Sequence, residues 1–235
     1  MDRPVVVLTG ASRGIGKATA FALGRAGAAL ALHARSEARL SQVAGALREM
    51  DVPVDYIVGD IRDPDTADRL VANALHTFKR IDALVNNAGV IEPISPVERL
   101  DVSAFARNIE VNLLGAVWAT RAALPALKNS QGRIVNISSG AAIEPVQGWA
   151  AYCASKAALN QFTRVCAAES PQVCSVAFSP GMTATDMQAV VRENGKRGMD
   201  ETALAGFRGA YERGELRDVN EVGEAAAGGG GGGEN

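Results

Sequence analysis

Short apolar runs rich in β-branched residues alternate along the chain with longer segments rich in Ala and Leu. Strands that are buried on both faces read as nearly continuous apolar runs, so the short runs predict strands of a parallel sheet. The longer segments have the length expected of helices that connect parallel strands. The predicted strands cover residues 4–9, 28–33, 54–58, 81–86, 133–137 and 173–178.

Helices are predicted between these strands and after them. They cover residues 15–26, 37–50, a segment capped by Asp63, Asp65 or Thr66 that reaches residue 78, and residues 103–128 and 149–168. Pro125 lies inside the fourth helix, where its missing N–H group predicts a disturbance. Because connections between parallel strands are right-handed, this alternation predicts an α/β fold with a doubly wound parallel sheet of Rossmann type.

The last part of the chain differs in character from the first 180 residues, which contain no linker or repeat. Residues 181–216 are richer in Gly, Met and charge, and their weak periodicity predicts a mobile loop with one or two short helices. Six consecutive glycines, Gly228 to Gly233, can neither pack nor hold a helix. We therefore expect a single domain over residues 1–224, with a substrate loop region at 182–216, and a disordered glycine-rich tail over 225–235.

Composition and charge exclude several classes of protein. The chain has 24 Lys and Arg against 26 Asp and Glu, a net charge of −2, and 47% hydrophobic residues. This balance is typical of a globular protein and does not favour nucleic-acid binding. The sequence contains no membrane-length apolar run, no secretory signal and too few histidines for a metal centre. Three cysteines without a Cys-x-x-Cys pair indicate free thiols, so a cytoplasmic protein is expected.

A glycine-rich turn follows the first predicted strand and leads into the first helix. In Thr9-Gly-Ala-Ser-Arg-Gly-Ile-Gly16, Gly10 permits the tight turn, Gly14 lets a pyrophosphate approach the backbone, and Gly16 lets the helix lie close to the sheet. The N-terminus of the helix offers N–H groups and a positive dipole end to phosphate. An ordinary strand–helix connection is the alternative. The dinucleotide contacts expected from this turn are Gly10, Ser12, Arg13, Gly14, Ile15 and Gly16.

A second group of residues points to chemistry on a carbonyl or alcohol. Tyr152 and Lys156 are four residues apart on a predicted helix and share one face, and Ser139 follows the strand at 133–137. A free tyrosine titrates near ~10, and a neighbouring ammonium group lowers the pKa of a phenol. A serine hydroxyl can hold a carbonyl oxygen while the tyrosine donates a proton to it. The alternative is a common surface pair on a helix.

The end of the second predicted strand indicates which nicotinamide cofactor is bound. Sites that prefer NAD usually place a carboxylate there for the ribose 2′-hydroxyl group. Here the strand ends in His33-Ala34-Arg35-Ser36, and Arg35 together with Arg13 could bind a 2′-phosphate. A solvated surface charge is the alternative for each arginine. Their joint occurrence favours NADP(H).

Over roughly residues 4–190 the chain resembles the classical short-chain dehydrogenases and reductases. Residues 9–16 resemble the cofactor loop of that family, and Asn86-Asn87-Ala88-Gly89 resembles its second signature. The resemblance implies that Ser139, Tyr152, Lys156 and Asn112 are the catalytic residues. Tyr152 would be the general acid, Lys156 would lower its pKa and hold the nicotinamide ribose, and Asn112 would support a proton-relay water. The further cofactor contacts that the resemblance implies are Asp60, Ile61, Asn87, Ala88, Gly89, Tyr152, Lys156, Pro180, Gly181, Thr183 and Thr185.

For several of these residues a structural role is the alternative. Asn112 could be a buried helix asparagine bonded to backbone, and Thr183 and Thr185 could cap the start of a loop. Ser138 is the neighbouring alternative to Ser139, and the family spacing of 13 residues to the tyrosine favours Ser139.

A narrower resemblance, over roughly residues 133–223, is to the sepiapterin reductase and benzil reductase branch, which reduces vicinal dicarbonyls with NADPH. It is carried by residues 136–139, 148–158 and 180–187. It implies substrate contacts from Ser139, Trp149 and Tyr152, with Trp149 as an aromatic wall or, alternatively, a core residue. Family members continue with a seventh strand that the sequence lacks, and they form dimers or tetramers, so a homo-oligomer is expected.

The resulting expectation is an NADPH-dependent carbonyl reductase that acts on a small ketone or vicinal diketone. One alternative is an NAD(P)-dependent alcohol dehydrogenase of the same fold, which would share every residue named above. Another is a non-catalytic dinucleotide-binding protein, which would keep Gly10, Gly14 and Gly16 and would not need Tyr152. The last alternative is an incomplete chain that does not fold stably.

Overall fold

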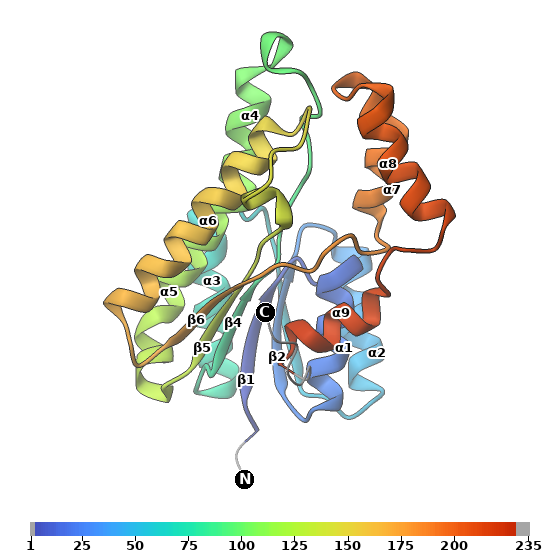
Figure 1. The fold of residues 1–235 in the computed structure, drawn as a ribbon. Helices are drawn as coiled ribbons and strands as arrows, with labels where there is room; N and C mark the ends of the chain where they lie inside the picture. Colours follow the sequence, from blue (N-terminus) through green and yellow to red (C-terminus); the bar gives the residue numbers. More distant parts are fainter. Residues whose placement is uncertain (1–2, 229–235) are drawn as a thin grey trace.

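The computed structural model describes residues 3–228 and contains one parallel sheet of six strands (Figure 1). The strand order is β3-β2-β1-β4-β5-β6. The first three strands extend the sheet in one direction from β1, and β4 to β6 extend it in the other, so the strand order reverses between β1 and β4. This is the doubly wound arrangement of the Rossmann type, as the alternating pattern predicts. The strands are β1 (Val5–Thr9), β2 (Ala29–Ala34), β3 (Val54–Val58), β4 (Ala83–Asn86), β5 (Arg133–Ile137) and β6 (Cys174–Phe178).

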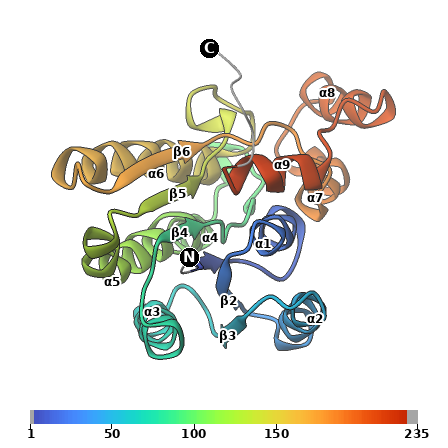
Figure 2. The ribbon, with the colours of Figure 1, turned by 90° about the horizontal axis from the view of Figure 1, so that it is seen from below.

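Helices cover both faces of the sheet (Figure 2). Side chains alternate between the faces along each strand, so Leu8 and Leu30 enter one core while Val7 and Ala31 enter the other. The first face carries α1 (Gly14–Arg25), α2 (Glu37–Arg48) and α9 (Val219–Ala226), and the second carries α3 (Pro64–Phe78), α5 (Gly115–Ser130) and α6 (Ala150–Glu169).

The helix expected over residues 103–128 is irregular, but not at the predicted place. It consists of α4 (Val102–Ile109), a π-helical turn (Glu110–Leu114) and α5, which continues through Pro125 as regular helix. The missing N–H group of Pro125 would have bonded the carbonyl of Arg121, which is an exposed residue. The prediction near Pro125 is therefore wrong. The irregularity lies instead in the π-helical turn, which contains the buried Asn112.

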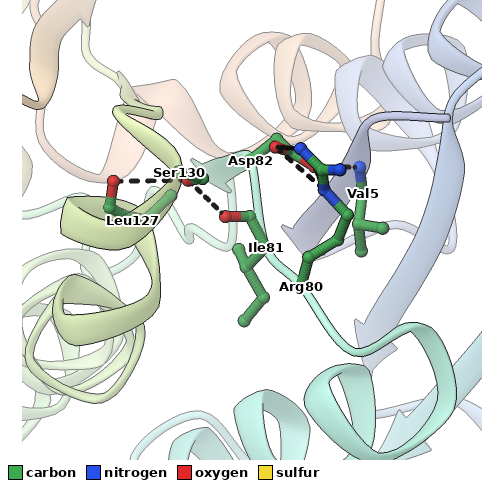
Figure 3. A network of polar contacts seen from close by, with 6 residues as sticks. All are labelled: Val5, Arg80, Ile81, Asp82, Leu127 and Ser130. Carbon is green, nitrogen blue, oxygen red and sulfur yellow. Dashed lines mark hydrogen bonds and ion pairs between the residues drawn. The ribbon is translucent and has the colours of Figure 1, made fainter. Parts of the chain in front are cut away.

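The amino ends of three central strands are tied together by a polar network around Asp82 (Figure 3). The Asp82 carboxylate accepts the backbone N–H of Val5 at 2.8 Å and pairs with the Arg80 guanidinium at 2.8 Å. The carbonyl of Asp82 also accepts the N–H of Arg133, and Ser130 Oγ donates to the Ile81 carbonyl at 2.7 Å. These bonds fix the register of β1, β4 and β5 at the end of the sheet where each strand begins.

Residues 182–216, called the lid below, contain two α-helices, α7 (Asp186–Asn194) and α8 (Glu201–Glu212), with a short 3₁₀ helix (Gly195–Arg197) between them. The ends of the lid are joined by a short parallel bridge, in which Arg217 N donates to the Met182 carbonyl at 2.8 Å and the Arg217 carbonyl accepts Ala184 N at 3.0 Å. The weak periodicity thus predicts the short helices of this region correctly.

After the lid, α9 packs tightly on α1. A Cβ on Gly223 would lie 2.6 Å from the Ala18 backbone, so the glycine permits the close approach of the two helices. The helix extends to the buried Ala226, and the first residues of the predicted tail are therefore helical. Residues 229–235 of that tail lie outside the described residues. Within residues 3–228 no strand follows β6.

Two further observations bear on the sequence predictions. Cys153, Cys166 and Cys174 are free thiols, as expected from their spacing. Among the described residues, no helix is both long and apolar enough to cross a membrane.

Candidate active site

A cavity of about 750 Å³ opens at the carboxyl ends of the strands, where the strand order reverses. It collects most of the residues that the sequence points to, although they come from segments far apart in the chain. Two predicted residues, Gly16 and Asn112, do not line it. The predicted residues that do are Gly10, Ser12, Arg13, Gly14, Ile15, Arg35, Asp60, Ile61, Asn87, Ala88, Gly89, Ser139, Trp149, Tyr152, Lys156, Pro180, Gly181, Thr183 and Thr185.

The glycine turn has the backbone that its sequence requires. Gly10 and Gly14 have φ values of +70° and +52°, in the left-handed region where side chains are disfavoured. A Cβ on Gly16 would lie 2.3 Å from the Gly10 carbonyl oxygen, so Gly16 serves the packing of α1 on the turn rather than the cavity wall. Asn87 supports the same turn, because its Nδ2 donates to the carbonyls of Thr9 and Gly10 at 3.1 and 3.0 Å.

The N-terminus of α1 faces the cavity with free backbone donors. Arg13 occupies the cap position, and its side chain forms no capping hydrogen bond to the described residues of the first turn. Gly14 and Ile15, the first residues of the helix, line the cavity. Exposed N–H groups, the positive end of the helix dipole and a turn without side chains fit a pyrophosphate group.

Positive side chains gather where β2 ends. Arg35 and Arg39 both line the cavity, and β2 ends in the buried Ala34 rather than in a carboxylate. Arg39 is a lining residue that the sequence reasoning missed, because it lies in the first turn of α2 whereas Arg35 precedes that helix. Arg13 also lines the cavity and pairs with Asp186 of the lid at 2.9 Å. The other acid in this part, Asp60, pairs with Arg62 at 2.7 Å, and this bond lowers the pKa of Asp60.

Tyr152 and Lys156 lie on one face of α6 and are both almost fully buried. Burial raises the pKa of Tyr152, and a hydrogen bond with Ser139 lowers it to a smaller extent. Burial also lowers the pKa of Lys156 to about 8, while its Nζ donates to the Ile137 carbonyl at 2.7 Å. The sequence led us to expect that Lys156 lowers the pKa of Tyr152, whereas in the structure burial raises that pKa. The phenol is therefore held protonated at neutral pH.

The two neighbouring serines at the end of β5 have different partners. Ser138 is buried, and its Oγ donates to Asn160 Oδ1 at 2.5 Å. Ser139 Oγ accepts the N–H of Ala141 at 3.2 Å, which leaves its hydroxyl proton for a bond toward Tyr152 or a ligand. The geometry favours Ser139, in agreement with the sequence spacing.

Asn112 lies behind the cavity wall rather than in it. Its Oδ1 accepts Val90 N at 2.8 Å, and its Nδ2 donates to the Val90 carbonyl at 2.9 Å, to Asn108 Oδ1 at 2.9 Å and to Ser155 Oγ at 3.1 Å. The side chain therefore acts as a buried, satisfied asparagine, the alternative role that the sequence left open. It ties the segment after Gly89 to α6, and any catalytic role of Asn112 stays a prediction. Asn108, its partner, was not found from the sequence.

An apolar part of the cavity lies beside Tyr152. Trp149 is buried, and its ring centroid lies 5.6 Å from that of Tyr152 in an edge-to-face arrangement. Phe207 of α8 lies 5.2 Å from Trp149 on the other side. The sequence singled out Trp149 but missed Phe207, because the weak pattern of the lid does not show which side chains face the cavity.

A comparison with protein families gives a clear assignment. The sequence model of the family described as short chain dehydrogenase matches residues 4–196. A benzil reductase ((S)-benzoin forming) of Saccharomyces cerevisiae is 35% identical over 228 residues, which cover 91% of this chain and 85% of that protein.

Solved structures agree with this assignment. A structure entitled KRED1-Pglu enzyme superposes with a TM-score of 0.92 at 36% identity, covering 96% of this chain and 93% of the other. An alcohol dehydrogenase from the archaeon Thermococcus sibiricus, complexed with 5-hydroxy-NADP, has a TM-score of 0.82 at 30% identity, with 96% and 89% of the two chains covered.

Proposed function

This chain belongs to the short-chain dehydrogenase family and is an oxidoreductase, and we propose that it is an NADPH-dependent carbonyl reductase. Its substrates would be small apolar ketones or vicinal diketones. The observation that carries the proposal is the position of the protonated Tyr152 phenol. It lies beside Ser139, and its cavity is bordered by the glycine turn on one side and by apolar side chains on the other. The similarity to a benzil reductase supports the diketone class.

The residues that would hold the cofactor line one cavity. The glycine turn and the N-terminus of α1 would bind the pyrophosphate, and Arg35 with Arg13 would bind the 2′-phosphate. By family resemblance, Lys156 would hold the nicotinamide ribose. When bound, NADPH supplies the hydride for the reduction. The adenosine side would contact Asp60, Ile61, Asn87, Ala88 and Gly89, and the nicotinamide side Pro180, Gly181, Thr183 and Thr185.

The chain itself supplies the proton and holds the reacting oxygen. Ser139 donates a hydrogen bond to the carbonyl oxygen and polarises it, and Tyr152 transfers its proton to the same oxygen as the alcohol forms. A raised pKa keeps Tyr152 loaded with that proton at neutral pH. Lys156, with a pKa of about 8, is able to return a proton to the phenolate near neutrality.

A second candidate is the reverse reaction, the oxidation of an alcohol. It is favoured by the structural similarity to an alcohol dehydrogenase that was crystallised with an NADP derivative. The same residues would act in the opposite order, with Tyr152 as the base. Because burial raises the pKa of Tyr152, the phenolate form needed for oxidation would require alkaline pH, whereas reduction would proceed at neutral pH.

The test replaces Tyr152 by Phe, which removes the proton donor and keeps the ring against Trp149. We expect NADPH oxidation with a diketone to fall about thousandfold, because general acid catalysis contributes roughly 10²–10⁴. NADPH binding, followed by cofactor fluorescence, should stay within about twofold of wild type. Turnover that survives in Tyr152→Phe would contradict the proposal, whereas tight binding without turnover in wild type would favour a binding protein.

The neighbouring serines supply a matched control. Ser139→Ala should reduce turnover about hundredfold, since it removes a donor to the developing oxyanion. Ser138→Ala removes only the bond to Asn160 and should leave turnover within a few-fold of wild type. An equal loss in both variants would point to a structural effect of this segment.

A further inference from the structure

The lid carries a row of side chains over the apolar part of the cavity. Val191 and Leu204 of the lid are fully buried, and Met187, Val191 and Phe207 line the cavity. Phe207 completes a continuous aromatic row with Trp149 and Tyr152, in which successive ring centroids lie 5.2 and 5.6 Å apart. The row therefore extends from the proton donor to the lid.

The lid is held in this place by a backbone contact at Gly198. A Cβ on Gly198 would lie 2.7 Å from the Ser95 nitrogen and 3.0 Å from the Gly148 Cα. A Cβ on Gly148 would in turn lie 2.9 Å from the Gly198 carbonyl. Ser95 N donates to the Gly148 carbonyl at 2.9 Å, so the segments at 95 and 148 are themselves joined. The lid backbone thus lies directly on the segment that leads into Trp149.

A second bond aligns α8 beyond this contact. Asp200 N donates to Gln147 Oε1 at 2.7 Å, and the Asp200 carboxylate caps the helix by accepting Ala203 N at 2.8 Å. Asp200 therefore fixes both the position and the start of α8. Phe207 follows two turns later, and its ring plane lies 36° from that of Trp149.

From this arrangement we infer that Phe207 is a specificity-determining residue, which selects substrates with a flat aromatic ring next to the reacting carbonyl. The inference rests on the proposed function and adds a substrate preference to it. Val146, Trp149, Met187 and Val191 belong to the same apolar cluster as Phe207 and line the same cavity, and all four are uncharged. Such a wall attracts an aromatic ring by apolar contact and ring packing, and it disfavours an anionic or strongly hydrated group.

The test compares two diketones that share the same reacting groups. Methyl phenyl diketone and methyl cyclohexyl diketone carry rings with equal numbers of carbon atoms, and only the phenyl ring is flat. In wild type, kcat/KM should be about tenfold or more higher for the phenyl compound than for the cyclohexyl compound. In Phe207→Ala, this ratio of the two kcat/KM values should fall by about tenfold. Phe207→Tyr, which keeps the flat ring, should restore the preference, whereas Phe207→Leu should not. NADPH affinity should not change in any of the three variants.

The glycine contact gives an independent test with a matched control in the same lid. Gly198→Ala forces the lid away from Ser95 and Gly148 and should lower the phenyl preference in the same direction as Phe207→Ala. A Cβ on Gly206 would meet no described atom within 4 Å, so Gly206→Ala should leave the preference unchanged. Thermal melting of each variant identifies any that fail to fold.

The outcomes separate this inference from the proposed function. If wild type reduces neither diketone with NADPH, the proposed function fails and the inference fails with it. If wild type reduces both without preference, or if the preference survives in Phe207→Ala and Gly198→Ala, the inference alone is overturned. A preference that falls in both variants and returns in Phe207→Tyr supports it.

Discussion

The charged groups at the two ends of the sheet, the half-buried Asp82 and the buried Lys156, have different kinds of partner. At the amino end, the Asp82 carboxylate accepts the backbone N–H of Val5 and pairs with the Arg80 guanidinium (Figure 3). The backbone carbonyl of Asp82 accepts the N–H of Arg133 in β5. At the carboxyl end Lys156 is buried with the Ile137 carbonyl as its acceptor, and burial lowers its pKa to about 8. The amino end pairs two opposite charges, whereas the carboxyl end holds the Lys156 ammonium group where burial disfavours its charged form.

This difference separates stability from chemistry. A carboxylate that is satisfied by hydrogen bonds and an opposite charge stabilises the fold. A buried ammonium group destabilises the fold and gains reactivity near neutral pH. The comparison predicts that removing the Asp82 carboxylate lowers the free energy of unfolding. Removing the Lys156 ammonium group should raise the free energy of unfolding and abolish activity.

The largest expected effect comes from Lys156→Met, which keeps an unbranched chain and removes the charge. Turnover should fall about hundredfold or more, because the acid loses the group that supplies its proton. The unfolding free energy at pH 7 should rise by up to roughly 3 kcal/mol, the equivalent of lowering the lysine pKa from 10.5 to about 8. Urea denaturation of both proteins measures this gain.

The pH dependence of that gain follows from the sign of the shift. Above pH 8 the folded protein loses the Lys156 proton while the unfolded chain keeps it up to its ordinary pKa of 10.5. The destabilisation in wild type is therefore complete below about pH 8 and disappears as the pH rises toward 10.5. A gap between the two proteins that stays constant from pH 7 to pH 10 would show that packing, rather than charge, is responsible.

A smaller effect, opposite in sign, is expected from Asp82→Ala at the other end of the sheet. Loss of the acceptor for Val5 N and Arg80 should lower the unfolding free energy by about 1–3 kcal/mol. At temperatures where the variant is folded, its kcat/KM should equal that of wild type. Asp68→Ala is the control, since its exposed pair with Arg121 at 3.6 Å should contribute at most about 0.5 kcal/mol. A loss of activity without a loss of stability would contradict the separation.

The smallest effect concerns cofactor choice at the carboxyl end. Arg35→Ser removes one of the guanidinium groups assigned to the 2′-phosphate, and the Kd for NADPH should rise about tenfold, or roughly 1.4 kcal/mol. The Kd for NADH, which lacks that phosphate, serves as the internal control and should change less than about twofold. Equal weakening of both cofactors would place Arg35 elsewhere in the site.

Much of the sheet was predictable because its signal is local. Two strands, β3 and β5, begin and end at the predicted residues, since short runs rich in β-branched residues are interpreted without knowledge of their neighbours. The glycine turn was predictable for the same reason, because Gly10 and Gly14 adopt positive φ values that favour glycine over other residues.

The remaining features depend on contacts that no local pattern contains. The π-helical turn at Glu110–Leu114 accompanies the bonds of Asn112 to Val90 and Ser155, which come from other segments. The pKa values of Tyr152 and Lys156 follow from burial in the folded state, which the spacing of the two residues does not show. Phe207 lies against Trp149 in the site, and Gly198 and Asp200 hold the lid against the segment before Trp149, contacts that no local pattern contains.

The most direct test of the proposed reductase activity measures whether an isotopic label on NADPH is transferred to the product. Purified protein is incubated with NADPH that carries deuterium at the transferable position of the nicotinamide, together with methyl phenyl diketone. The account predicts a hydroxyketone with one deuterium on the carbinol carbon for each NADPH oxidised, and no such product with Tyr152→Phe. NADPH that binds and remains unoxidised, or labelled product formed equally by Tyr152→Phe, would contradict it.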